Sequence, residues 1–230
     1  FGQHYASELM YNNKVDQGEL YQEAIKYYAN ILTPFSHLVV KKIEEVLSFK
    51  LPVDMICPSH GVIWKDDPLQ IVHKYMEWAG DYQENQITLV YDTMWDATRK
   101  MAEAIAEGIR TADPDVTIKL LNCGKHDKND VITEIFKSKA ILLGSSTINN
   151  GILSAAASTL EMIKGLKFKK KSAAAFGSYG WSGEAVQIIE NQLKESDFNI
   201  LLPGLKELWN PDTDAQKRCF NYGYEFAKKL

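Results

Sequence analysis

The sequence has little cysteine, little proline and no long apolar run, and each shortage excludes a class of protein. Only three cysteines occur in 230 residues, so a disulfide framework is not expected. They lie far apart, at Cys57, Cys123 and Cys219, and no CxxC pair is available for a zinc ribbon. No uncharged apolar stretch approaches the roughly 18 residues of a membrane helix. This pattern predicts a protein of the reducing cytoplasm.

The charge balance is slightly acidic, with a net charge of -4 at pH 7. A general nucleic-acid binder needs a basic face, so that class is disfavoured. A basic start followed by an apolar run and a cleavage site is also missing, which argues against a retained signal peptide. The chain begins with Phe1 instead of Met, and we expect its natural N-terminus to lie upstream.

Residues 1–84 carry mostly helical patterns. Apolar residues recur at helical spacing in three segments, 19–32, 36–47 and 68–82. A short apolar stretch, 53–57, predicts a strand that would bury Cys57. A polar turn over 81–86 then separates this part from the rest of the chain.

From residue 85 onward, apolar strands alternate with polar loops and amphipathic helices. Strands are predicted at 87–91, 117–122, 140–144, 173–177 and 199–202. Helices are predicted at 98–111, 128–137, 154–164, 184–195 and 212–229. Five strands alternating with five helices imply a parallel sheet that is covered on both faces. We therefore predict an α/β fold, with a doubly wound five-stranded sheet in the order 2-1-3-4-5.

Three predicted loops concentrate hydroxyl, amide and glycine groups at the carboxyl edge of this sheet, where doubly wound folds bind their ligands. They follow strands one, three and four, and we call them loops one, two and three. The candidate binding residues of loop one are Thr93, Met94, Trp95, Asp96, Ala97 and Thr98. Those of loop two are Ser145, Ser146, Thr147, Ile148, Asn149 and Asn150. Those of loop three are Ser178, Tyr179, Gly180, Trp181, Ser182 and Gly183.

Loop one runs from a buried strand directly into a helix, which suits a phosphate. A helix N-terminus presents unpaired amides and about half a positive charge. The hydroxyls of Thr93 and Thr98 would add donors, each contributing about 1.5–3 kcal/mol towards a charged acceptor. The segment matches neither GxGxxG nor GxxxxGK[ST], so dinucleotide and nucleoside-triphosphate sites are disfavoured. The alternative is that both threonines only cap the helix.

Loop three suggests a flat ligand. Tyr179 and Trp181 flank Gly180, and two large aromatic side chains at a loop tip would waste apolar surface unless they cover something planar. The hydroxyl and amide side chains of loop two could bind the polar edge of a ring. Either loop alone could be a simple surface turn. A phosphate cradle beside an aromatic clamp predicts flavin mononucleotide (FMN).

Three stretches of the sequence resemble the flavodoxin-like domain of flavodiiron proteins. They are Tyr-Asp-Thr-Met from Tyr91 with Thr98, Gly-Ser-Ser-Thr-Ile-Asn-Asn from Gly144, and Phe-Gly-Ser-Tyr-Gly-Trp-Ser-Gly from Phe176. Residues 1–5, 27–35 and 59–61 resemble the end of that family's metallo-β-lactamase-like domain. The resemblance implies that 1–84 is the C-terminal portion of a metallo-β-lactamase-like αββα diiron domain. It implies that 85–230 is a flavodoxin-like FMN-binding domain.

The resemblance also implies an electron-transport oxidoreductase. Such enzymes reduce dioxygen to water or nitric oxide to nitrous oxide, with FMN passing electrons to a diiron centre. The implied partners are rubredoxin or a similar small electron donor and a second copy of the chain, paired head to tail. Neither a nucleic acid nor a membrane is implied. The choice between the two gases stays open.

Only one of the family's diiron ligands is present. The resemblance implies His60 as a metal ligand, while the HxExDH motif and the other ligands are missing. One imidazole cannot hold two irons, so we expect the remaining ligands upstream of Phe1. His4 and Tyr28 are candidates for the lining of the gas-reducing pocket, with a packing role as the alternative.

Other readings of the sequence remain open. A flavin-only electron carrier would lack iron, and a β-lactamase-like hydrolase with an appended binding module would hold zinc. An assembly module would bind no ligand at all. A run of lysines over 164–171 is expected to be a solvated turn, with a docking patch for an acidic electron donor as the alternative.

Overall fold

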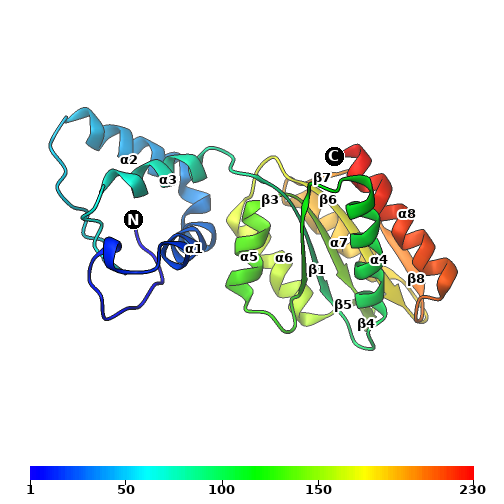
Figure 1. The fold of residues 1–230 in the computed structure, drawn as a ribbon. Coiled ribbons are helices and arrows are strands. Elements are labelled where there is room, and N and C mark those ends of the chain that lie inside the picture. The colour runs from blue at the N-terminus through cyan, green and yellow to red at the C-terminus, as the bar shows by residue number, and fades with distance from the viewer. The chain divides into compact units, whose positions relative to one another are not determined.

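The computed structural model describes all 230 residues, which form two compact units, Phe1–Tyr82 and Gln83–Leu230. Figure 1 shows helices in the first unit and a sheet flanked by helices in the second. No helix combines the length and the apolar character that a membrane span requires.

The first unit consists mainly of helices around an aromatic core. Its elements are α1 (Gln17–Tyr27), α2 (Ser36–Ser48) and α3 (Leu69–Ala79), with shorter helical turns at Asn12–Lys14, Tyr28–Leu32 and Thr33–Phe35. The segment predicted as one helix over 19–32 is therefore α1 followed by a π-helical turn. The rings of Tyr28, Tyr75 and Trp78 pack with centroids 5.1–5.7 Å apart.

The strand predicted over 53–57 is wrong. Ile56 forms an isolated bridge with Trp64, and no ladder extends from it. Cys57 is consequently exposed instead of buried. Prolines stand on both sides of this segment, at Pro52 and Pro58, and each removes an amide donor that a ladder would need.

The second unit is built on a parallel sheet. Its strands are β1 (Glu84–Asp92), β2 (Thr117–Asn122), β3 (Ser138–Ser145), β6 (Ser172–Tyr179), β7 (Asn199–Ile200) and β8 (Leu205–Leu208). They lie in the order β2-β1-β3-β6-β7, and β8 also pairs with β6. The predicted doubly wound order 2-1-3-4-5 is confirmed.

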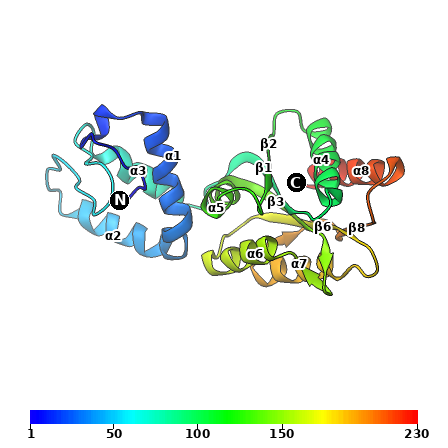
Figure 2. The same cartoon turned by 90° about the horizontal axis from the view of Figure 1, so that it is seen from below.

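Five helices cover the sheet, namely α4 (Ala97–Ala112), α5 (Lys128–Lys137), α6 (Ser154–Leu166), α7 (Glu184–Glu195) and α8 (Thr213–Lys229). Helices α4 and α8 lie on one face and α5, α6 and α7 on the other (Figure 2). A buried apolar cluster joins β1, β3 and β6 to α4 and α8. Burial on both faces explains why the central strands are nearly continuous apolar runs.

The fifth predicted strand, 199–202, is corrected by the structure to two short strands. Strand β7 pairs with the first two residues of β6, and β8 pairs with its last four. Pro203 and Gly204 stand between them. A Cβ at Gly204 would lie 2.2 Å from a methyl carbon of Val186, so the chain passes close to α7 at this break. The break lets β8 follow β6 to its carboxyl end.

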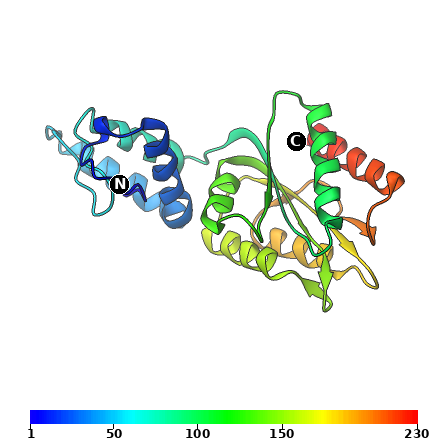
Figure 3. The same cartoon turned by 60° about the horizontal axis from the view of Figure 1, so that its bottom comes forward.

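Loop two contains a small hairpin that the sequence analysis did not predict. Strands β4 (Thr147–Ile148) and β5 (Gly151–Ile152) pair antiparallel and project beyond the sheet (Figure 3). The turn residues Asn149 and Asn150 have φ angles of 48° and 58°. Two successive positive φ angles are typical of a type I′ turn, and asparagine tolerates them well.

The contact between α4 and α8 depends on two glycines. A Cβ at Gly108 would lie 2.0 Å from the carbonyl oxygen of Phe220, and one at Gly223 would lie 2.0 Å from that of Ile105. We predict that Gly108→Ala lowers the free energy of unfolding by about 1–3 kcal/mol or more, because backbone must move to admit the methyl group. Urea denaturation measures this.

Gly165→Ala is the matched control, since no atom lies within 4 Å of the added Cβ. Alanine is the better helix former, so this variant should be neutral or more stable by up to about 1 kcal/mol. Equal destabilisation by both substitutions would contradict the close helix contact.

Candidate functional site

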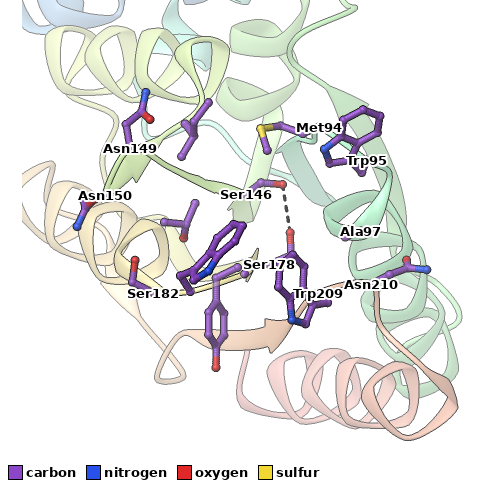
Figure 4. A pocket seen from close by; sticks show the side chains of 15 residues that line it. Met94, Trp95, Ala97, Ser146, Asn149, Asn150, Ser178, Ser182, Trp209 and Asn210 are labelled. Atoms are coloured by element: carbon purple, nitrogen blue, oxygen red, sulfur yellow. Dashed lines mark hydrogen bonds between the residues drawn. The ribbon is translucent and has the colours of Figure 1, made fainter.

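A cavity of about 700 Å³ opens at the carboxyl edge of the sheet, and residues from all three predicted loops line it (Figure 4). The lining residues are Met94, Trp95, Ala97, Ser146, Thr147, Ile148, Asn149, Asn150, Ser178, Tyr179, Gly180, Trp181, Ser182, Trp209 and Asn210. Ligand sites commonly enclose about 300–1,000 Å³. The structure therefore brings the three loops together around a space of cofactor size.

Five of the candidate binding residues do not line this cavity. They are Thr93, Asp96, Thr98, Ser145 and Gly183. Ser145 is completely buried, and its hydroxyl accepts a hydrogen bond from the backbone amide of Leu153 at 3.0 Å. This bond joins the two ends of loop two, so Ser145 stabilises the loop without lining the cavity.

Three buried hydroxyl groups tie the loops to one another. Thr98 lies 2.9 Å from Ser146 and 3.0 Å from Ser178, and these two serines lie 3.1 Å apart, measured between hydroxyl oxygens. The three side chains are at most 6 % exposed. Figure 4 shows the contact between the two serines as a dashed line among the lining side chains. Each residue comes from a different loop, so this triangle fixes the relative positions of all three.

The start of α4 has free amides. The first intrahelical bond runs from the amide of Lys100 to the carbonyl of Asp96, which leaves the preceding amides without helical partners. The side chain of Asp96 does not cap the helix. It pairs instead with Arg99 at 3.0 Å, and this guanidinium lowers the pKa of the Asp96 carboxyl. The negative charge in loop one is thus neutralised within the protein.

Thr93 carries a buried hydroxyl that has no hydrogen-bond partner. Its backbone amide is already bonded to the Asp92 carboxylate at 2.9 Å. A buried, unsatisfied hydroxyl costs about 1–3 kcal/mol, so such groups are rare without a reason. Thr93 precedes Ala97, the first residue of α4, by four residues, and its hydroxyl is the one in loop one that lacks a partner.

Aromatic side chains form the open side of the cavity. The indoles of Trp95 and Trp181 are 85 % and 90 % exposed. Trp209 meets Trp181 edge to face, with ring centroids 5.1 Å apart. Trp209 and Asn210 were missed by the sequence analysis, because they follow β8, a strand that it did not predict. The available signal was a tryptophan directly after the alternating stretch Leu-Lys-Glu-Leu over 205–208.

The β4–β5 hairpin is attached to the N-terminus of α7. The amide nitrogen of Asn150 donates to the Glu184 carboxylate at 3.3 Å, and the backbone amide of Ala185 donates to the Thr147 hydroxyl at 3.4 Å. Ser182 in loop three also bonds to the Glu184 carboxylate. Glu184 therefore links loops two and three.

The candidate residues of the first unit do not form a metal centre by themselves. No group of three or more His, Cys, Asp or Glu residues that could hold a metal occurs in residues 1–230. His60 and His4 are exposed, and their rings lie 6.1 Å and 5.3 Å from the ring of Tyr27. Tyr28 is fully buried, and its hydroxyl lies 2.8 Å from that of Ser36.

The lysine run over 164–171 lies at the other edge of the sheet from the cavity. It precedes β6, whose eight residues span about 25 Å at roughly 3.3 Å per residue. A donor docked there would be too far from the cavity for direct exchange, so the docking alternative is disfavoured. Lys171 is buried instead of solvated, and its ammonium donates to the carbonyls of Phe136 and Ser138.

Comparison with known proteins agrees with this geometry. The flavodoxin family model matches residues 89–223. The chain belongs to the flavodoxin family. The match begins within β1 and covers the other strands and all three loops, so the predicted flavodoxin-like fold is confirmed.

Curated relatives extend the likeness over the whole chain. The anaerobic nitric oxide reductase flavorubredoxin of Aliivibrio fischeri is 53 % identical over 229 residues, which is 100 % of this chain and 46 % of the relative. The chain thus spans about half the length of the curated relatives it matches.

Two solved structures are also similar. The rubredoxin oxygen:oxidoreductase of Desulfovibrio gigas has a TM-score of 0.92 and 33 % identity, covering 99 % of this chain and 57 % of that one. The flavodiiron protein of Giardia intestinalis has a TM-score of 0.92 and 28 % identity, covering 100 % and 56 %. The resemblance to flavodiiron proteins is confirmed.

The Glu184 link predicts a dependence on pH. Its hydrogen bonds, that from Ser182 above all, hold the pKa of the Glu184 carboxyl below its usual 4.5. A carboxylate with a lowered pKa stabilises the fold fully above its unfolded pKa, and this contribution is lost as the pH falls through the folded pKa. The Tm of wild type should therefore exceed that of Glu184→Gln near pH 6, and the difference should shrink as the pH falls below 4.5.

Glu195→Gln, an exposed change at the other end of α7, controls for the loss of a charge. A Tm difference for Glu184→Gln that stays constant from pH 6 to pH 3 would show that the carboxylate does not make this link.

Proposed function

We propose that this chain binds FMN in the cavity and serves as the electron-transfer part of a flavodiiron-type oxidoreductase. The observation that carries the proposal is that the start of α4 and exposed indoles line one cavity, while the buried Thr93 hydroxyl of the same loop lacks a partner. The match to the flavodoxin family supports it.

The phosphate of FMN fits the start of α4. The free amides there and the hydroxyl of Thr93 are donors that lack acceptors within the chain. A helix N-terminus also favours an anion through its dipole. No lysine or arginine lines the cavity, so hydrogen bonds would bind the phosphate. The Thr98 hydroxyl is proposed to act indirectly, by holding Ser146 and Ser178 in place.

The isoalloxazine ring fits the aromatic side of the cavity. Trp181, Tyr179 and Trp95 present flat apolar surface, and the hairpin residues Asn149 and Asn150 present amides to a polar edge. FMN, when bound, can accept and release electrons one or two at a time. The residues of the chain would orient the ring, shield part of it from water and leave its outer edge open to a partner.

The residues of this chain do not fit a diiron centre on their own. His60 remains our proposed ligand, but no cluster of three ligands surrounds it. We therefore propose that 1–84 is the C-terminal portion of a metallo-β-lactamase-like domain whose other ligands come from outside residues 1–230. His4 and Tyr28 are proposed to pack around that site.

The substrates and partners of the whole protein are proposed from its relatives. A flavorubredoxin that is a nitric oxide reductase and a rubredoxin oxygen:oxidoreductase suggest nitric oxide or dioxygen as substrate and rubredoxin as donor. We further propose a head-to-tail homodimer and a cytoplasmic location, which the three free cysteines support.

Thr93→Val tests the phosphate site. The Thr93 hydroxyl is buried without a partner in the protein, so its removal should raise the Tm of the FMN-free chain instead of lowering it. It should weaken FMN binding about 10- to 150-fold, because a hydrogen bond to a charged group contributes about 1.5–3 kcal/mol. Flavin fluorescence quenching measures the Kd.

Riboflavin, which lacks the phosphate, is the matched control ligand. Its affinity should be the same for Thr93→Val and wild type. An equal loss for both ligands would place Thr93 away from the phosphate, and a wild-type protein that binds neither ligand would refute the FMN site itself.

The activity of the whole protein is tested separately. The full-length protein should contain two irons per FMN and couple the oxidation of reduced rubredoxin to consumption of nitric oxide or dioxygen. A full-length protein that binds FMN but no iron would instead support the flavin-only carrier.

A further inference from the structure

Trp181 is in an unusual position for a residue that should hold a ligand. Its indole is 90 % exposed, and it stands between Gly180 and Ser182 on a loop with a second glycine two residues on. Glycine allows the backbone many conformations, so this loop does little to orient the ring. A neighbouring group must therefore restrict Trp181 if it is to present one face to a ligand.

Trp209 supplies that contact. The two indoles meet edge to face with an interplanar angle of 70° and centroids 5.1 Å apart, a favourable arrangement for aromatic pairs. Trp209 also lines the cavity, although it lies outside the three loops. Figure 4 shows it among the lining residues, near Ser178 and Asn210.

Trp209 is itself held from several sides. Its backbone amide donates to the carbonyl of Tyr179 at 2.7 Å, which continues the pairing of β8 with β6. Its φ angle is 55°, a left-handed conformation that is uncommon for a bulky residue and has to be maintained by its surroundings. Gly180 leaves room for the ring, since a Cβ there would lie 3.0 Å from two indole carbons.

The strand that carries Trp209 is anchored as well. Glu207 is 4 % exposed and accepts two hydrogen bonds from Arg218 of α8, at 2.9 Å and 2.6 Å. On the other side, the Asn210 side chain accepts from the ammonium of Lys100 in α4 at 3.0 Å. The segment of Trp209 is therefore tied to two helices and to the sheet, while the Trp181 indole is 90 % exposed.

We propose that Trp209 is a positioning residue of the flavin site, which holds Trp181 in the orientation that covers the ring of the cofactor. This inference rests on the proposed FMN site and adds to it a fourth segment, Trp209–Asn210. Its effect on FMN passes through Trp181 and disappears when Trp181 is removed.

The test titrates FMN into the 230-residue chain and its variants, with flavin fluorescence and visible circular dichroism as readouts. Trp209→Ala should weaken binding about three- to tenfold, which is the usual contribution of an aromatic pair. It should also change the visible dichroism of bound FMN in the same way as Trp181→Ala. Trp209→Phe, which keeps an aromatic ring, should restore most of both signals.

A double-mutant cycle separates positioning from direct contact. The double variant of Trp181→Ala and Trp209→Ala should bind FMN as Trp181→Ala alone does. Additive losses would overturn the proposal, as would a Trp209→Ala variant with wild-type affinity and spectrum. Leu208→Ala is the control, because Leu208 is exposed on the same strand and does not line the cavity.

A substitute variant and the wild-type titration complete the test. If Trp209→Ala fails to fold, Gly180→Ala replaces it, since a methyl group 3.0 Å from two indole carbons crowds the Trp209 ring and should weaken binding in the same direction. Gly180→Ala with unchanged binding would then overturn the proposal. Failure of the wild-type chain to bind FMN would refute the proposed function, and the wild-type titration shows this before any variant is compared.

Discussion

The site depends on a triangle of hydroxyl groups formed by Thr98, Ser146 and Ser178. Their oxygens lie 2.9–3.1 Å apart and are buried, so each hydroxyl can donate to one neighbour and accept from the other. The three residues lie on segments that are far apart in the sequence and adjacent in space. Because unpaired hydroxyls are costly in a buried position, the triangle stabilises one relative placement of the three loops. Ser146 and Ser178 also line the cavity, so the triangle fixes the positions of the lining residues next to them.

Much of the fold follows from local patterns in the sequence. Helices α5 and α8 begin after Asp127 and Asp212, whose carboxylates accept amides of the first turn, and their predicted starts agree with the structure within a residue. The central strands are apolar on both faces, which marks them as parallel and buried. The strand predictions are wrong where a strand forms only if a partner strand is available. The stretch 53–57 has strand-like residues without a partner strand, and the fifth strand continues along β6 past a Pro-Gly break.

The candidate site could be predicted only in part for the same reason. All three loops were predicted because their hydroxyl, amide, aromatic and glycine residues are concentrated within a few positions. The sequence could not tell that Thr98 points inward to two serines while the Thr93 hydroxyl is left unsatisfied, because both are threonines in one loop. Trp209 escaped prediction because its place at the cavity depends on the register of β8 against β6, which pairs Leu208 with Tyr179.

The two ends of the cavity are built from different chemistry. At the α4 end, donors come from amides and hydroxyls, and the nearby Asp96 is neutralised by Arg99. At the other end, exposed indoles provide flat surface and no charge. The lining contains no lysine or arginine, and Lys100 contacts it from outside, through the Asn210 side chain. Charge near a flavin ring is one of the means by which a protein tunes it. In the proposed FMN site, amides and the position of the indoles would be the main groups that tune the flavin. Both depend on the geometry of the loops.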